Sequence, residues 1–204
     1  MPTGKSAPQG AVQAGQGSLR VRWVLLFYGV LASLAVIWRL WADQVLPWRS
    51  AHTAPSAPAW ARLGIGIAAG LALVVVSRAW VARSSAGQRL ASELGRLLGP
   101  LSWRRAWLFA LASGLGEEAL FRGALQPRVG LVAATLLFGA AHYVPRPGLR
   151  VWSLFALLAG ALFGAMFEAT GDLLAPATAH VVVNGLNLRR LARSEGGDEG
   201  GDGV

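Results

Sequence analysis

Cysteine is absent from this chain of 204 residues, and charged residues are scarce. Without a thiol, the protein has no disulfide, no thiolate nucleophile and no cysteine-ligated metal. Charged residues make up 14% of the chain, whereas soluble domains average about 25%, and 54% of the residues are hydrophobic. This composition predicts an all-α fold, a polytopic membrane helical bundle with the lipid bilayer around it.

Acidic residues number only ten, and Lys5 is the one lysine among 19 basic residues. The formal net charge of +9 does not indicate nucleic acid binding, because the arginines separate apolar segments and form no dense basic stripe. They are typical of membrane-protein loops that follow the positive-inside bias. The preference for arginine over lysine also suggests a bacterial genome rich in G and C.

Six hydrophobic segments predict about six transmembrane helices, since about 20 residues cross a hydrocarbon core of roughly 30 Å. They lie at residues 20–42, 60–82, 103–125, 129–143, 149–169 and 172–191.

The rest of the chain divides around these segments. Residues 1–18 are expected to be a disordered tail, 19–82 to hold the first two transmembrane helices, 103–191 to form a four-helix core, and 192–204 to be a flexible acidic tail. The segment 83–102 is amphipathic and predicts a helix lying in the membrane interface.

The distribution of Lys and Arg predicts the orientation of the helices. Most of these residues fall in the N-terminal tail, in alternate loops and in the C-terminal tail, which places both termini in the cytoplasm. We therefore expect a multi-pass protein of the bacterial inner membrane. Two pairs of glycines at small-xxx-small spacing, Gly66 with Gly70 and Gly160 with Gly164, predict close helix contacts.

The stretch LGEEALFRG places three ionisable side chains inside an apolar segment, where each costs several kcal/mol. Glu118 and Arg122 are four residues apart, so they share a helix face and can pair. Glu117 lies about 100° around the helix, which leaves its carboxylate without a local cation and available for proton transfer. The alternative is that the cluster only holds helices together.

Two further apolar segments also carry polar side chains. His142 ends the fourth segment, and His180 and Asn184 lie one turn apart in the sixth; His52 lies in a Pro/Ala-rich loop and is expected to be a surface residue. Polar groups in lipid face the bundle interior, so we expect those of the three segments to converge. A common depth with Glu117 requires a tilted or broken fourth helix, or a site near the cytoplasmic face.

Three motifs in order resemble the signature of the CAAX-protease and bacteriocin-processing family, also called the ABI family, whose members are glutamic intramembrane endopeptidases. The motifs are EEALFR, FGAAH and HVVVN, and the resemblance covers about residues 103–191. It implies that Glu117 is the general base, that His142 holds the water, and that His180 with Asn184 forms the oxyanion hole. Glu118 and Arg122 would support the site, Phe138 would pack beside His142, and no cofactor or metal is implied.

Other protease classes lack their motifs here: Ser113 is not in a GxSG sequence, the ATGD sequence is not GxGD, and there is no HExxH. Two alternatives stay open, a zinc-dependent version of the same protease and a non-catalytic immunity or scaffold protein. The expected substrate is a membrane-anchored protein or peptide cut near its anchor. A prenyl-type tail, a bacteriocin leader and a C-terminal sorting tail of the kind cut by the myxosortase branch all fit.

Overall fold

The computed structural model describes residues 9–50 and 55–194 of the chain, and these residues form a bundle of helices. His52 lies outside the described residues. The elements, in order, are α1 (Gln9–Asp43), α2 (Ala59–Arg83), α3 (Ser85–Leu98), α4 (Trp103–Glu118), the π-helix η1 (Ala119–Leu125), α5 (Gln126–Ala141), α6 (Arg150–Thr170) and α7 (Leu174–Ser194).

The ends of the described chain differ from the predicted tails. Helix α1 begins at Gln9, so residues 9–18, expected to be disordered, are helical. Helix α7 continues to Ser194, two residues beyond the predicted start of the acidic tail at 192. The remainders of both predicted tails, 1–8 and 195–204, lie outside the described residues.

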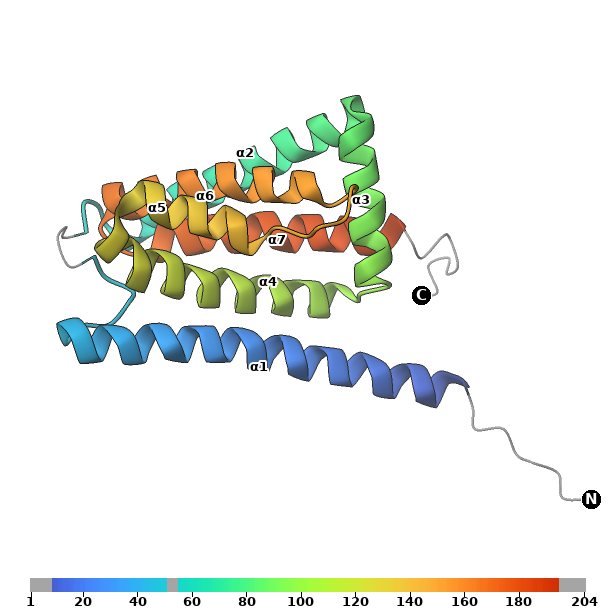
Figure 1. Ribbon diagram of the computed structural model, residues 1–204, viewed down its shortest axis with the longest axis horizontal. Helices are drawn as coiled ribbons and strands as arrows, with labels where there is room; N and C mark the ends of the chain where they lie inside the picture. The colour runs from blue at the N-terminus through green and yellow to red at the C-terminus, as the bar shows by residue number, and fades with distance from the viewer. Residues whose placement is uncertain (1–8, 51–54, 195–204) are drawn as a thin grey trace, which may run out of the picture.

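The prediction of an all-α membrane bundle is confirmed. Within the described residues, four helical stretches are long and apolar enough to cross a membrane: Val21–Asp43, Ala59–Arg83, Trp103–Ala141 and Arg150–Thr170. The third holds two of the six expected segments, because the chain reverses at Gly130, where φ is 79°, and α5 returns alongside α4 (Figure 1).

Helix α7, the sixth expected segment, is not among those four stretches. Its 21 residues give a length of about 32 Å, enough to cross a bilayer. It packs against α2, α3, α4 and α6, and most of its first half is buried. Because its neighbours separate it from lipid, this helix can carry polar side chains without exposing them to hydrocarbon.

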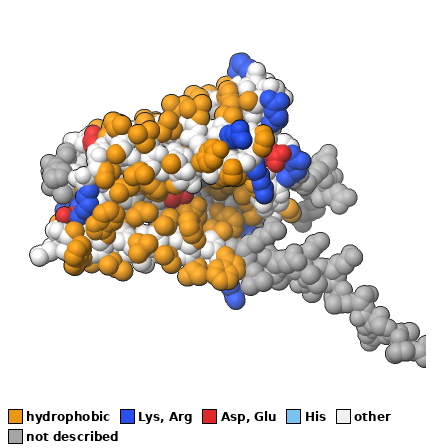
Figure 2. All heavy atoms as spheres, viewed as in Figure 1, with side chains coloured by type: hydrophobic (Ala, Val, Ile, Leu, Met, Phe, Trp, Pro, Cys, Tyr) orange, Lys and Arg blue, Asp and Glu red, His pale blue; other side chains and the backbone are white. Residues whose placement is uncertain are grey.

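Helix α3 lies across one end of the bundle, nearly perpendicular to the other helices (Figure 1). The start of α1 and the end of α7 are at this same end. Arginine side chains gather over α3, while apolar side chains cover most of the remaining face in this view (Figure 2). This arrangement is typical of an interfacial helix at the boundary between lipid and water.

Two glycines of α2 allow its close contact with α7. A Cβ atom at Gly66 would lie 2.6 Å from the Ala175 carbonyl oxygen, and one at Gly70 would lie 2.8 Å from that of Ala179. The predicted small-xxx-small contact at this pair is therefore present, and it brings the backbones of the two helices together.

We predict that Gly66→Ala lowers the stability of the bundle by about 1–3 kcal/mol, the usual effect of adding volume to a packed site. Gly64→Ala is the matched control, because a Cβ there meets nothing within 4 Å. Thermal unfolding in detergent measures both. Equal midpoints for the two variants would contradict the close contact between α2 and α7.

Candidate active site

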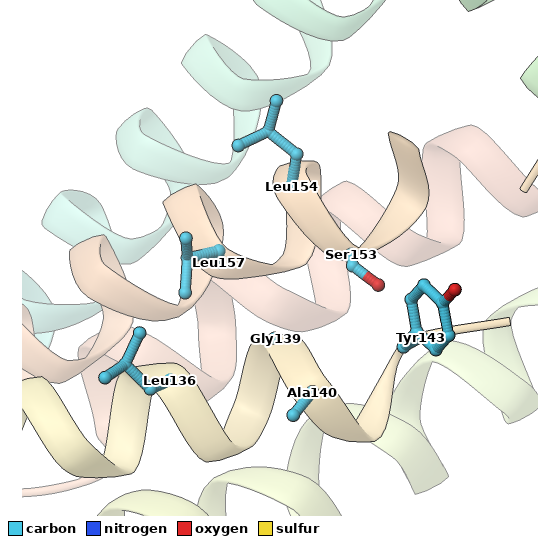
Figure 3. A pocket seen from close by; sticks show the side chains of 7 residues that line it. All are labelled: Leu136, Gly139, Ala140, Tyr143, Ser153, Leu154 and Leu157. Carbon is cyan, nitrogen blue, oxygen red and sulfur yellow. The ribbon is translucent and has the colours of Figure 1, made fainter. Parts of the chain in front are cut away.

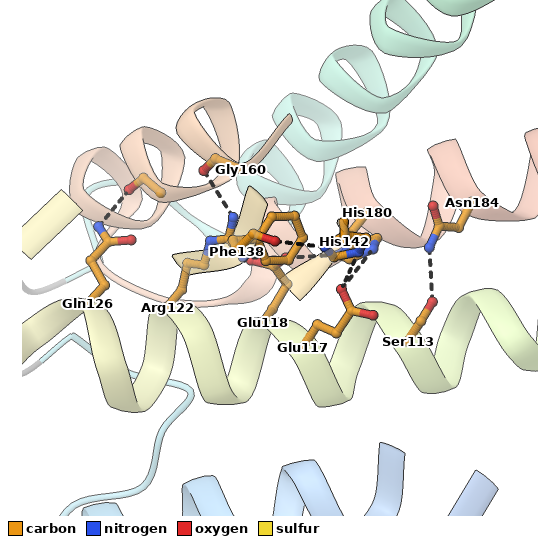
Figure 4. Close-up of polar contacts among 11 residues, drawn as sticks. Ser113, Glu117, Glu118, Arg122, Gln126, Phe138, His142, Gly160, His180 and Asn184 are labelled. Carbon is orange, nitrogen blue, oxygen red and sulfur yellow. Dashed lines mark hydrogen bonds and ion pairs between the residues drawn. The ribbon is translucent and has the colours of Figure 1, made fainter. Parts of the chain in front are cut away.

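Helices α4 and α7 run antiparallel (Figure 1) and present matching polar pairs to each other. Ser113 and Glu117 lie one turn apart on α4, and His180 and Asn184 lie one turn apart on α7. Glu117 faces His180, and Ser113 faces Asn184 (Figure 4). Gly114 permits this approach, since a Cβ there would lie 2.6 Å from Cγ2 of Val181.

The Glu117 carboxylate lies between two imidazoles from different helices. Its Oε2 is 3.5 Å from Nε2 of His142 and 3.9 Å from Nε2 of His180. Glu117 is 7% exposed, and Oε2 has no hydrogen-bond partner among the described residues. The structure therefore brings together three of the polar groups that the sequence placed in separate segments.

His142 reaches this depth because α5 is short. The helix ends at Ala141, beside the middle of α7 (Figure 1), and Pro145 and Pro147 follow in the loop toward α6. Proline disfavours continuation of a helix, so the chain covers the remaining distance as a loop. The sequence left open a tilted or broken fourth helix, or a site near the cytoplasmic face. The structure has a fourth helix that stops partway along the bundle, an arrangement that the sequence reasoning did not consider.

The two histidines have their Nδ1 atoms occupied. Nδ1 of His142 is 2.8 Å from the Phe138 carbonyl oxygen, and Nδ1 of His180 is 2.8 Å from Oε1 of Glu118. A carbonyl and a carboxylate only accept hydrogen bonds, so each Nδ1 carries the hydrogen. In the neutral rings both Nε2 atoms are then acceptors directed at Glu117. A water molecule beside them can donate its two hydrogens to this set of acceptors.

Glu118 and Arg122 form the pair that their spacing predicts. Nη1 of Arg122 is 3.2 Å from Oε1 of Glu118. Both residues are buried, with Arg122 1% and Glu118 0% exposed. Nη2 of Arg122 donates to the Gly160 carbonyl at 2.9 Å, and the guanidinium lies 4.2 Å from the Phe138 ring centre. Glu118 is therefore neutralised, whereas no arginine among the described residues forms an ion pair with Glu117.

The helix carrying these residues changes geometry directly after the two glutamates. Residues Ala119–Leu125 form a π-helical turn, which the sequence did not predict. Turns of this kind are rare and frequent at functional sites. Here the turn carries Arg122 and also packs on the α1–α2 loop, since a Cβ at Gly123 would lie 2.4 Å from the Pro47 carbonyl oxygen.

Gln126 extends the polar cluster and was missed by the sequence reasoning. Its Nε2 donates to the Gly164 carbonyl at 3.0 Å and to Oε1 of Glu168 at 3.1 Å. The sequence offered one signal for it: Gln126 follows Arg122 by four residues, just as Gly164 follows Gly160 by four. Because the predicted Gly160/Gly164 pair has no side chains, Arg122 and Gln126 can reach the carbonyl oxygens of these two α6 residues. A Cβ at Gly160 would lie 3.1 Å from Nη2 of Arg122.

Ser113 is a second residue that the sequence reasoning did not include in the site. Its buried Oγ accepts a hydrogen bond from Nδ2 of Asn184 at 3.0 Å and donates to the Ala110 carbonyl at 3.2 Å. The signal was its position one turn before Glu117. This bond uses one N–H of the Asn184 amide and leaves the other for a ligand.

The resemblance implies that Asn184 donates to an oxyanion, and on that expectation we predict that Asn184→Ala lowers kcat by about 10²–10³-fold. Ser113→Ala should lower kcat about fivefold through one lost hydrogen bond. The matched control is Ser77→Ala, because Ser77 accepts from Asn187 of the same helix at 3.3 Å, outside the site. Cleavage assays on purified protein measure all three. If Ser113→Ala cleaves no more slowly than Ser77→Ala, Ser113 does not assist the site through its hydrogen bond to Asn184.

A shallow apolar groove runs between α5 and α6 (Figure 3). It has a volume of about 450 Å³ and is lined by Leu136, Gly139, Ala140, Tyr143, Ser153, Leu154 and Leu157. Tyr143 directly follows His142 in the sequence, so the groove lies close to the site.

The geometry is accompanied by a match to a known family. Residues 99–186 match the family described as type II CAAX prenyl endopeptidase Rce1-like. This region begins just before α4 and includes every site residue described above.

A relative is found among the curated proteins. The uncharacterized protein YpbD of Bacillus subtilis (strain 168) is 41% identical over 76 residues, which are 36% of this chain and 39% of YpbD. The matched region is thus about two fifths of that relative's length. No solved structure matches the chain. Residues 99–186 of this chain are thus similar to the Rce1-like family of type II CAAX prenyl endopeptidases.

Proposed function

We propose that this protein is an intramembrane glutamic endopeptidase that hydrolyses a peptide bond of a membrane-anchored substrate. The observation that carries the proposal is the convergence of Glu117, His142 and His180, from three helices, around one carboxylate oxygen. The match to a family of endopeptidases supports the reaction class.

In the proposed reaction Glu117 acts as general base. It takes a proton from a water molecule that His142 helps to hold, and the water oxygen bonds to the carbonyl carbon of the substrate. The free N–H of Asn184 donates to the oxyanion. His180 adds a second donor from Nε2 when both of its ring nitrogens carry protons, with the Glu118 carboxylate at Nδ1 balancing the charge. The C–N bond then breaks, and the leaving amine receives the proton.

The proposed substrate has an apolar anchor, because the site is buried in the bundle and adjoins the groove between α5 and α6. A prenyl-type tail, a leader peptide and a C-terminal sorting tail all meet this requirement. Purified protein should cut a peptide carrying such an anchor far faster than the same peptide without it. Efficient cleavage of the soluble peptide would refute this requirement.

Comparing the new peptide ends in host membranes tests the proposal as a whole. Membranes from cells with the wild-type protein should contain ends that are missing with Glu117→Gln, when immunoblots show equal amounts of both proteins. The sequences around these ends would distinguish the three substrate classes. Identical ends, with the cellular phenotype preserved, would favour a non-catalytic scaffold.

The second candidate is a metal-dependent version of this protease. Among the described residues, no three His, Cys, Asp or Glu side chains are arranged to hold a metal ion, but Glu117 with two histidines is a donor set that zinc accepts. We predict that dialysis against a strong chelator leaves the activity unchanged. Loss of activity that zinc restores would favour the metal-dependent reaction.

We propose that the protein spans the bacterial inner membrane with both termini in the cytoplasm. The support is that α3, with its arginines, lies at the same end as the start of α1 and the end of α7 (Figure 1). Since the chain has no cysteine, one introduced thiol is a unique label. An impermeant reagent added to the periplasm should label Ala57→Cys and not Ser85→Cys; the reverse would invert the orientation.

A further inference from the structure

Helix α1 lies outside the family match, which begins at residue 99, yet it contacts the helix that carries Glu117. It packs on α4 and η1, and α4 lies between α1 and α7 (Figure 1). Over residues 21–43, the part of α1 whose side chains the structure describes, most side chains are exposed, including Trp23, Phe27 and Trp41. Its contact with α4 is therefore the feature that relates it to the site.

Helix α1 approaches α4 closely at Gly116, the residue before Glu117. A Cβ at Gly116 would lie 2.8 Å from the Tyr28 carbonyl oxygen and 3.2 Å from the Tyr28 Cβ. The missing side chain at Gly116 thus lets the backbone of α1 reach α4 at this level. It brings the half-buried Tyr28 against the turn of α4 that holds Glu117.

The Tyr28 side chain is close enough to the Glu117 side chain to interact with it electrostatically. A tyrosine hydroxyl can donate, and an ionised carboxylate can only accept. The contact comes from the α1 side of α4, whereas His142 and His180 belong to α5 and α7. The Tyr28 phenol therefore approaches Glu117 from the α1 side, while Oε2 of Glu117 is directed at the two imidazoles.

We propose that Tyr28 is a positioning residue for Glu117. Its hydroxyl donates to the carboxylate and fixes the orientation in which Oε2 takes the proton from water. The inference rests on the proposed function, in which Glu117 is the general base. It means that a site whose motifs all lie within residues 99–186 is completed by a side chain from the N-terminal helix.

The test is Tyr28→Phe in the full chain, with cleavage of an anchored peptide followed at several substrate concentrations. A hydrogen bond to a charged group has an effect on the order of tenfold or more, so kcat should fall about tenfold with KM within twofold of wild type and an unchanged thermal midpoint. Phe27→Leu is the matched control, because Phe27 neighbours Tyr28, with ring centres 5.1 Å apart, but offers no hydroxyl. It should keep the wild-type kcat.

A double mutant separates positioning from packing. If Tyr28 acts through the Glu117 carboxylate, adding Tyr28→Phe to Glu117→Gln should change the residual rate less than twofold, because coupled residues are not additive. A full tenfold further loss in that background would overturn the inference. So would a Tyr28→Phe defect confined to KM or accompanied by a lower thermal midpoint.

The outcomes distinguish this inference from the proposed function on which it rests. If Glu117→Gln retains the wild-type rate, the general-base proposal fails. If Glu117→Gln is inactive while Tyr28→Phe keeps the wild-type kcat, the general base stands and only the role of Tyr28 is refuted.

Discussion

Glu117→Gln should lower kcat for an anchored peptide by about 10²–10⁴-fold, the usual contribution of a general base. Glutamine has nearly the same shape as glutamate, but its amide does not accept a proton from water at neutral pH. Because Oε2 of Glu117 faces His142 and His180 and no arginine, the substitution removes no buried ion pair with a permanent cation. We therefore expect the folded protein to persist with little change in its thermal midpoint.

Glu168→Gln is the matched control for this experiment. Glu168 is also a carboxylate of the bundle, but it is exposed, and its Oε1 accepts a hydrogen bond from Gln126 at 3.1 Å. The same change at this position should leave kcat within about twofold of wild type. A comparable loss in both variants, or a Glu117→Gln protein that no longer folds, would remove the support for Glu117 as the base.

Arg122→Leu should have the largest effect on stability. It leaves the Glu118 carboxylate, which is 0% exposed, without its arginine and removes the bond to the Gly160 carbonyl. Breaking a buried ion pair by removing one partner costs about 3–5 kcal/mol. At roughly 2–4 °C per kcal/mol for a chain of this size, the thermal midpoint in detergent should fall by more than about 6 °C.

Arg96→Leu supplies the comparison for an exposed pair. Arg96 lies 2.6 Å from Glu93 on α3, and its side chain is 59% exposed, so its loss should cost less than about 1 kcal/mol. Adding Glu118→Gln to Arg122→Leu should recover part of the lost midpoint, because an amide is cheaper to bury than an unpaired carboxylate. Equal midpoints for Arg122→Leu and Arg96→Leu would show that the buried pair does not stabilise the bundle.

Much of the candidate site could be predicted from spacing within single helices. The i, i+4 interval of Glu118 and Arg122 predicted their pairing, and the same interval in α7 placed His180 and Asn184 on one face. The scarcity of polar groups in apolar segments predicted that these residues would meet. Such predictions succeed because the helical period fixes which residues share a face, whatever the rest of the chain does.

The residues that sequence reasoning missed are those whose partners lie on other helices. Ser113 bonds to Asn184, Gln126 bonds to the α6 carbonyl of Gly164, and Tyr28 lies close to Glu117. No spacing rule connects positions 71, 38 or 89 residues apart. Each contact depends on how closely two helices approach, and that distance is set by small residues such as Gly114, Gly116 and Gly164.

The sequence by itself determined that the chain is a membrane helical bundle, which helix faces carry polar groups, and which glutamate pairs with an arginine. Only the tertiary structure decided that α5 stops beside the middle of α7, that both imidazoles direct Nε2 toward Glu117, and that α1 packs against the turn of α4 that carries Glu117. The physical reason is that the face on which a residue lies is a local property, set by the period of its own helix. The level at which a side chain lies in the bundle, and the distance between two helices, depend on how side chains pack between helices far apart in the chain.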